Sequence, residues 1–174
     1  MPVHNSISFS IEQLAEYHDR QSFCCGNEKL DNYFRSFITQ DSKRNIANPY
    51  VIFDIKNNNI IGYYTLSVSG VDREKFPLIV SKKLPKYSLI GVILIGRLAV
   101  SKEYKGCGWG KILILDSLYR SLEVNTIASA FAVIVEAIDE DAVRFYQKFN
   151  FQIFSDKPYT LFQKMSDVIK LFRS

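Results

Sequence analysis

Leu98-Ala99-Val100, followed by Lys105-Gly106-Cys107-Gly108-Trp109-Gly110 and Lys111, is the stretch of sequence that decides the fold. The nearly continuous apolar run at 90–100 is typical of a strand buried on both faces, and the apolar spacing at 111–122 predicts a helix. The alternate glycines between them let the backbone approach a ligand closely. A helix that begins directly after them offers free N–H groups and the positive end of its dipole. We therefore predict that an anion binds at this loop.

The spacing of the three glycines narrows the kind of anion. The loop does not follow Gly-x-x-x-x-Gly-Lys-Ser/Thr, the pattern that holds a nucleoside triphosphate, and it does not follow Gly-x-Gly-x-x-Gly, the dinucleotide pattern. A glycine-rich turn between a strand and a helix is also compatible with a purely structural role. The spacing by itself leaves both interpretations open.

The rest of the chain predicts one α/β (α+β) domain over residues 1–174, with a mixed, mostly antiparallel sheet flanked by helices. The expected helices lie at about 10–18, 31–38, 111–122 and 139–148. The expected strands lie at about 50–55, 60–68, 90–100, 130–137, 151–154 and 159–164, the first two forming a hairpin across Lys56-Asn57-Asn58-Asn59.

The composition excludes several classes of protein. With 174 residues, 47% of them hydrophobic, the chain can bury one sizeable core. No apolar run approaches the ~20 residues of a membrane-spanning helix, and the N-terminus shows no secretory signal, so we expect a cytoplasmic protein without membrane contact. The three cysteines have no spacing typical of a metal site, and we expect no metal.

Positive charge is concentrated in the middle of the chain, where residues 61–110 carry eight basic and three acidic side chains. Lys82, Lys83 and Lys86 would suit a polyanion such as a phosphate-bearing cofactor or a nucleic acid. An ordinary solvated lysine surface is the alternative. Arg97 belongs to the same segment and could instead make an internal ion pair.

The glycine loop resembles motif A of the GCN5-related N-acetyltransferases (GNAT), Gln/Arg-x-x-Gly-x-Gly/Ala, with Lys105 in place of Gln or Arg and with Gly108 and Gly110 as the glycines. A second signature of the family, Asn-x-x-Ala-x-x-Phe/Leu-Tyr, resembles the segment from Asp139 to Tyr146. The resemblance implies a GNAT fold and acetyl-CoA (coenzyme A) as the cofactor. The cofactor-binding residues that it implies are Leu98, Ala99, Val100, Lys105, Gly106, Cys107, Gly108, Trp109, Gly110, Lys111 and Asp139.

The same resemblance implies that Tyr146 is a general acid, which would give a proton to the thiolate that leaves when an amine attacks the thioester. A core aromatic residue is the structural alternative for Tyr146. No general base is evident, because His4 and His18 lie outside both motifs. An α-amine is partly neutral at pH 7, whereas a lysine amine is not, so the missing base favours an α-amine acceptor. Water relays and carboxylates such as Glu136 remain alternatives.

A narrower resemblance, over about residues 23–163, is to the GNAT toxins of bacterial toxin-antitoxin pairs. It is carried by Cys25 to Phe34, Ile61 to Ser67, Leu84 to Tyr87 and Gly96 to Val100. The resemblance implies acetylation of aminoacyl-tRNA, inhibition of translation, a ribbon-helix-helix antitoxin as partner and a dimer. Lys82, Lys83, Lys86 and Arg97 are then candidates for the tRNA-facing surface. A GNAT enzyme acting on a small-molecule amine or a protein N-terminus, and a module that only binds, are the alternatives.

Overall fold

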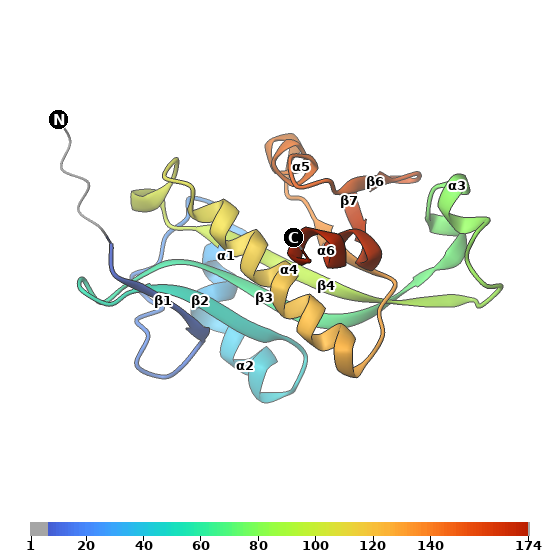
Figure 1. Ribbon diagram of the computed structural model, residues 1–174. Coiled ribbons are helices and arrows are strands. Elements are labelled where there is room, and N and C mark those ends of the chain that lie inside the picture. The colour runs from blue at the N-terminus through green and yellow to red at the C-terminus, as the bar shows by residue number, and fades with distance from the viewer. Residues whose placement is uncertain (1–6, 174) are drawn as a thin grey trace. The chain divides into compact units, whose positions relative to one another are not determined.

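The computed structural model describes residues 7–173 (Figure 1). Its seven strands form a mixed sheet in the order β1-β2-β3-β4-β5-β7-β6. The pairs β1–β2, β5–β7 and β6–β7 are antiparallel, and β4–β5 is parallel. The sequence-based expectation of an α/β fold on a mixed sheet is confirmed.

The strands are β1 (Phe9–Gln13), β2 (Asn48–Asp54), β3 (Asn59–Asp72), β4 (Leu89–Val100), β5 (Ala132–Glu136), β6 (Gln152–Phe154) and β7 (Lys157–Lys164). The α-helices are α1 (Glu28–Asn32), α2 (Ile38–Lys43), α3 (Leu78–Ser81), α4 (Trp109–Ile127), α5 (Glu140–Gln147) and α6 (Met165–Phe172). A π-helix, η1 (Tyr33–Phe37), joins α1 to α2, and two short 3-10 helices are η2 (Arg73–Lys75) and η3 (Lys102–Tyr104).

The chain divides into two compact units. The first comprises Met1–Thr65 and Arg97–Leu115, and the second comprises Leu66–Gly96 and Asp116–Ser174. Three long elements, β3, β4 and α4, contribute residues to both units. The two units are therefore not consecutive stretches of sequence, and the single domain expected over residues 1–174 stays a prediction.

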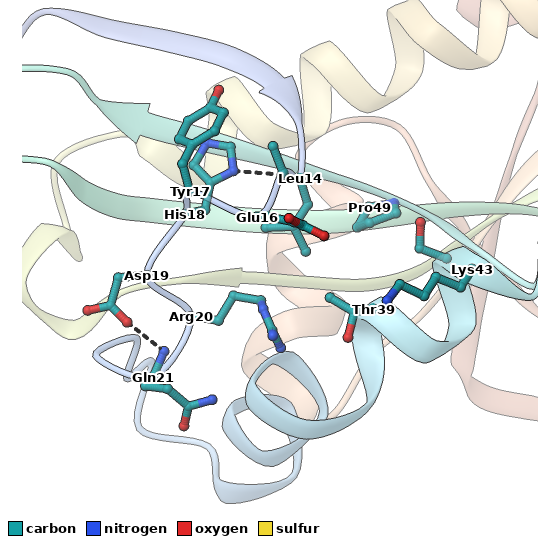
Figure 2. Close-up of a pocket in the computed structure, with 12 residues that line it drawn as sticks. Leu14, Glu16, Tyr17, His18, Asp19, Arg20, Gln21, Thr39, Lys43 and Pro49 are labelled. Carbon is teal, nitrogen blue, oxygen red and sulfur yellow. Dashed lines mark hydrogen bonds between the residues drawn. The ribbon is translucent and has the colours of Figure 1, made fainter.

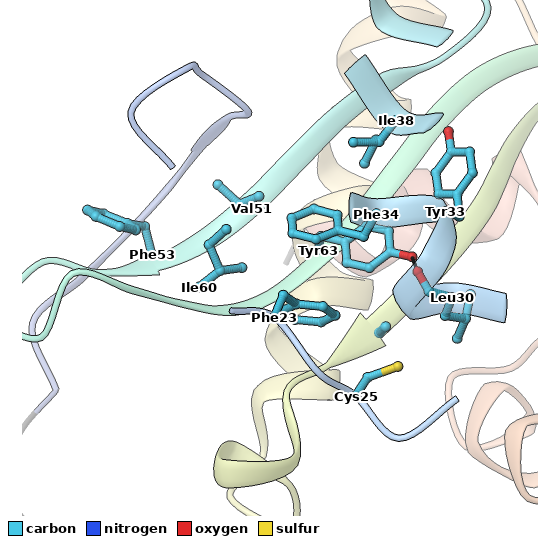
Figure 3. Close-up of a cluster of buried hydrophobic side chains, with 11 residues drawn as sticks. Phe23, Cys25, Leu30, Tyr33, Phe34, Ile38, Val51, Phe53, Ile60 and Tyr63 are labelled. Atoms are coloured by element: carbon cyan, nitrogen blue, oxygen red, sulfur yellow. Dashed lines mark hydrogen bonds between the residues drawn. The ribbon is translucent and has the colours of Figure 1, made fainter. Parts of the chain in front are cut away.

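The core of the first unit is a cluster of aromatic rings between helical and strand residues (Figure 3). Phe34 of η1 stacks on Tyr63 of β3 with ring centroids 4.3 Å apart, and Phe23 packs edge-on against Tyr63 at 5.4 Å. The Tyr63 hydroxyl is satisfied in this apolar setting because it donates a hydrogen bond of 3.0 Å to the carbonyl of Leu30. The cluster thus attaches the segment 28–38 to the sheet.

The helix expected at residues 10–18 is wrong. Residues Phe9–Gln13 form the edge strand β1, which pairs with β2 from Phe9–Asp54 to Gln13–Tyr50. The few apolar residues of this segment are compatible with a strand as well as with a helix. The segment forms a strand because it pairs with β2. The helix expected at 31–38 is confirmed, although it is longer and is interrupted by η1.

The second unit has its own aromatic core. The ring of Phe76 lies 5.0 Å from that of Phe154 and 5.2 Å from that of Phe162, and apolar side chains of β4 and β5 complete the cluster. The strands and the helix expected from residue 130 onward are confirmed as β5, α5, β6 and β7. The short helices α3 and α6 were not expected from the sequence.

The central strand β4 is only partly as expected. Residues Val92, Ile93 and Ile95 are buried, as the apolar run predicts. Leu89, Gly91 and Arg97 are exposed, so the strand is not buried on both faces over its whole length.

Among residues 7–173, no helix is both long enough and apolar enough to cross a membrane.

Candidate functional site

The loop after β4 adopts a backbone conformation that requires glycine at two positions. Gly106 and Gly108 have φ angles of +77° and +86°, the left-handed region that side chains disfavour. A β-carbon at either position would meet no atom of the described chain within 4 Å. Crowding inside the protein therefore does not explain these glycines, and the space beside them is open to a ligand.

The same loop presents backbone N–H donors. The first bonds of α4 are donated by Lys111 and Ile112 to the carbonyl of Gly108, at 3.1 and 3.3 Å. Within residues 7–173, residues 105–108 form a turn, and no hydrogen bond of good geometry is donated by the N–H groups of residues 106–110. They lie at the positive end of a helix of 19 residues, and Lys105 and Lys111 are exposed beside them. The residues present therefore fit an anion such as a pyrophosphate.

The side chains of Trp109 and Cys107 differ in burial: the first is buried and the second is exposed. Trp109 is 7% exposed, and its ring packs edge-on against Phe9 with centroids 5.0 Å apart. The indole therefore belongs to the core of the first unit, and only the backbone N–H of Trp109 is left for a ligand. Cys107 is exposed, with its sulfur 3.6 Å from the carbonyl of Lys105.

The strand residues predicted to face the cofactor lie at the end of β4. The parallel pairing of β4 with β5 runs from Val92–Ala132 to Ile95–Val135, and β4 continues to Val100. Leu98, Ala99 and Val100 thus follow the last of these pairs, where their polar backbone groups are not used in that ladder. This arrangement fits a strand end that offers N–H groups to an extended ligand.

Tyr146 lies on the inner side of α5 in the second unit. It is 5% exposed and packs against Phe145 and Phe151, with ring centroids 5.3 and 5.7 Å away. Burial raises the pKa of its hydroxyl above the usual range. No partner for this hydroxyl is found in the part of the chain that the structure describes. The Tyr146 hydroxyl is therefore protonated at neutral pH.

Local interactions stabilise both ends of α5, one of which departs from the family signature. Asp139 caps the helix, because its carboxylate accepts a hydrogen bond of 2.8 Å from the N–H of Ala142. Asn150 adopts φ +65°, the conformation that glycine or asparagine takes after a helix. Asp139, which stands where the signature has Asn, thus keeps the helix cap, and Asn150 forms the turn that follows the helix.

The basic candidates differ in their contacts. Arg97 is exposed but stacks on an aromatic ring, with its guanidinium carbon 3.5 Å from the ring centre of Tyr33. Its internal contact is therefore an aromatic ring rather than the carboxylate considered above. Lys82, Lys83 and Lys86 are exposed at and after the end of α3.

The first unit contains a cavity of about 500 Å³ that the sequence did not predict (Figure 2). It is lined by residues 14–21, Thr39, Ser42, Lys43 and Pro49, and none of the predicted site residues borders it. No sequence motif marks it, because its lining comes from the irregular segment after β1 and from α2.

In residues 7–173, no group of three or more His, Cys, Asp or Glu side chains could hold a metal.

His18, which borders this cavity, has a structural role. Its Nδ1 accepts a hydrogen bond of 2.9 Å from the N–H of Ala15, and its Nε2 lies 3.0 Å from the Glu12 carboxylate. The ring is 3% exposed and both of its nitrogens are engaged. His18 is therefore unsuited to act as a base on a bound amine, and His4 lies outside the described residues.

A glycine loop with open space for an anion, placed between a strand and the start of a long helix, is compatible with the coenzyme A-binding class of acyltransferases. The family model "Acetyltransferase (GNAT) domain" matches residues 48–153, and the chain belongs to this family. It is an acetyltransferase that uses acetyl-CoA.

Several characterised proteins are similar over nearly the whole chain. A tRNA-acetylating toxin of Mycobacterium tuberculosis is 27% identical over 89% of this chain and 91% of its own length. The crystal structure of the Y145F mutant of KacT matches with a TM-score of 0.88 and 27% identity, over 94% of this chain and 99% of KacT. AtaT complexed with acetyl-methionyl-tRNAfMet matches with a TM-score of 0.87 and 26% identity, over 95% and 99%.

Proposed function

We propose that this acetyltransferase is a toxin that acetylates the α-amine of aminoacyl-tRNA and thereby blocks translation. The observation that carries the proposal is the match, over 95% of the chain, to AtaT complexed with an acetylated methionyl-tRNA. The similarity to the tRNA-acetylating toxin supports the same substrate class. The exposed cations Lys82, Lys83, Lys86 and Arg97 are the groups that we propose for tRNA phosphates.

For the cofactor, we propose two groups of binding residues. Leu98, Ala99 and Val100 would pair with the extended arm through their backbone. Lys105, Gly106, Cys107, Gly108, Trp109, Gly110 and Lys111 would hold the pyrophosphate through N–H groups and two cations. Asp139 is proposed only as a support of α5, since its carboxylate is occupied by the helix cap.

For the chemistry, we propose direct attack of the α-amine on the thioester, with Tyr146 as general acid. Acetyl-CoA, when bound, would supply the acetyl group: the C–N bond of the amide would form, the C–S bond would break, coenzyme A would leave as a thiolate, and the attacking nitrogen would lose a proton to water. Tyr146 would hold a proton on its hydroxyl and give it to that sulfur, because burial keeps the phenol protonated. An N–H group of the Leu98–Val100 strand would stabilise the negative charge that develops on the carbonyl oxygen.

The proposed biology follows from the toxin assignment. A ribbon-helix-helix antitoxin is the expected protein partner, a homodimer is the expected assembly, and the cytoplasm is the expected location because charged tRNA is found there. Growth arrest on induction, and its relief by the antitoxin gene, would support this assignment.

The decisive experiment offers the purified protein labelled acetyl-CoA together with aminoacyl-tRNA or with the same tRNA deacylated. We expect label on aminoacyl-tRNA alone, since only the charged tRNA carries an α-amine. Absence of label with every aminoacyl-tRNA would reject the proposal. Label on a polyamine, an antibiotic or a protein N-terminus instead would identify a GNAT enzyme with another acceptor.

A further inference from the structure

We propose that Asp31 is a positioning residue for the acetyl-CoA loop. Its carboxylate would fix the segment Cys24–Gly26, and that segment would hold Lys102, from which the loop continues to Gly110. This inference rests on the proposal that residues 105–111 bind the cofactor. Asp31 lies in the first turn of α1 and far from the loop in sequence.

Asp31 is a buried carboxylate whose oxygens both face backbone donors. It is 6% exposed, and it accepts hydrogen bonds from the N–H of Cys25 at 2.7 Å and from the N–H of Gly26 at 3.3 Å. Burial alone would raise its pKa, but these N–H donors, together with the side chains of Cys25 and Cys24, outweigh burial and hold the pKa below its usual range. Asp31 is thus an ionised group that orders two consecutive peptide units.

The ordered segment contacts the start of the cofactor loop in two places. The carbonyl of Cys24 accepts a hydrogen bond of 2.9 Å from the N–H of Lys102. Gly26 lies against the Lys102 side chain so closely that a β-carbon there would be 2.9 Å from Cε, and its φ of +90° also requires glycine.

A cavity lies between these two parts of the backbone. Residues Ser22, Phe23 and Cys24 line a cavity of about 220 Å³ together with Ser101, Lys102, Glu103 and Tyr104. The hydrogen bond from the N–H of Lys102 to the carbonyl of Cys24 joins the two segments beside this space.

Lys102 leads directly into the loop. It is the first residue of the single turn η3, whose carbonyl accepts a hydrogen bond of 3.4 Å from the N–H of Lys105. Gly106 and Gly108 follow with open space around them. A shift of Lys102 therefore changes the direction of the N–H groups that we assign to the pyrophosphate.

The test uses two substitutions with matched controls. Lys102→Pro removes the lysine side chain and the N–H that donates to the Cys24 carbonyl, and the backbone tolerates it because proline suits the first position of a helical turn and Ser101 is extended, with ψ 144°. Lys102→Ala removes the side chain but keeps the N–H. Asp31→Asn replaces one carboxylate oxygen by an NH₂ donor, and Asp41→Asn changes a carboxylate that faces Tyr33 instead.

The readouts are the acetyl-CoA Kd by calorimetry and hydrogen exchange of the amides at 103–110. Asp31→Asn and Lys102→Pro are expected to weaken acetyl-CoA binding about tenfold and to speed exchange in the loop. Asp41→Asn is expected to stay within about twofold of the unchanged protein, and Lys102→Ala, which keeps the hydrogen bond to Cys24 but loses the side-chain contact with Gly26, is expected to weaken binding less than Lys102→Pro does. A merely structural role of Asp31 would lower stability without changing loop exchange in the folded state.

Unchanged affinity and exchange in Lys102→Pro would overturn the proposal, even if Asp31→Asn failed to fold. Gly108→Ala separates this result from the assignment of the loop. If Gly108→Ala also left the Kd unchanged, the loop would not be the cofactor site. If Gly108→Ala weakened binding while Lys102→Pro and Asp31→Asn did not, only the positioning role would be wrong.

Discussion

A β-carbon added to Gly62 would lie 2.7 Å from the carbonyl oxygen of Ala99 and 2.9 Å from Cδ1 of Leu113. Ala99 is in the strand that we assign to the cofactor, and Leu113 is fully buried in α4. Neither neighbour can move away without a shift of a backbone or of the core. Glycine at position 62 therefore allows β3 to approach the functional end of β4.

Gly62→Ala is accordingly expected to lower the free energy of unfolding by about 2 kcal/mol, as overpacked sites do. Gly70→Ala, in the same strand, is the control, because its β-carbon would be 3.6 Å from the Leu89 side chain, an ordinary contact. Chemical denaturation measures both. Equal stability of the two variants would show that the strands do not approach closely at Gly62.

Gly108→Ala is expected to cost about 1 kcal/mol of stability, because φ +86° is unfavourable for alanine, and to weaken acetyl-CoA binding about tenfold. Gly91→Ala is the control, since its β-carbon would approach only the Ser129 carbonyl, at 3.9 Å. Calorimetry gives the Kd and thermal unfolding gives the stability. Wild-type affinity in the Gly108 variant would argue against the loop as the pyrophosphate site.

Tyr146→Phe is expected to reduce the acetylation rate about 100-fold while the acetyl-CoA Kd stays within about twofold. The ring keeps its contacts with Phe145 and Phe151, so the fold is preserved and only the proton donor is lost. Single-turnover kinetics measure the rate, with Tyr159→Phe on β7 as the control. A variant as fast as the unchanged enzyme would assign Tyr146 to the core alone.

Acid is expected to destabilise the protein partly through Asp54. Although burial opposes its ionisation, the side-chain and backbone N–H groups of Asn57, together with Tyr104 and Lys56, hold its pKa below the usual 3.8. A carboxyl group with a lowered folded-state pKa stabilises the fold above its unfolded pKa, and this contribution is lost as the pH falls through the folded pKa.

Between pH 6 and pH 2, roughly the range in which carboxylates titrate, Asp54→Asn should therefore flatten the fall of unfolding free energy, while lowering stability at neutral pH. Asp167→Asn, on the surface of α6, should leave the slope unchanged. Urea unfolding at each pH measures the effect. An unaltered slope in Asp54→Asn would mean that this carboxyl group is not linked to folding.

The combined substitution of Lys82, Lys83 and Lys86 by Gln should weaken tRNA binding and reduce its dependence on salt, by about one unit of slope for each lost phosphate contact. Lys170→Gln is the control, because this lysine pairs with Asp167 on α6. Affinities measured over a range of salt concentrations give the slope. An unchanged slope would leave these three lysines as an ordinary solvated surface.

Local patterns in the chain were enough to predict much of the fold. The apolar runs that became β4 and β5, the turn between β2 and β3, and the glycines before α4 are read from neighbouring residues. The similarity of residues 105–110 and 139–146 to family signatures was enough to predict the acetyltransferase class, which the family match confirms. These features are predictable because strand, turn and helix preferences act over a few residues.

Only the tertiary structure decided the features that depend on distant partners. Phe9–Gln13 is a strand because β2 pairs with it. The guanidinium of Arg97 stacks on the ring of Tyr33 and does not pair with a carboxylate of the described residues. The sequence by itself determined where the loop with its glycines lies and which chemistry it suits. The structure decided that the Cys24 carbonyl accepts a hydrogen bond from Lys102, three residues before the loop, because a hydrogen bond between remote segments depends on how the whole unit packs.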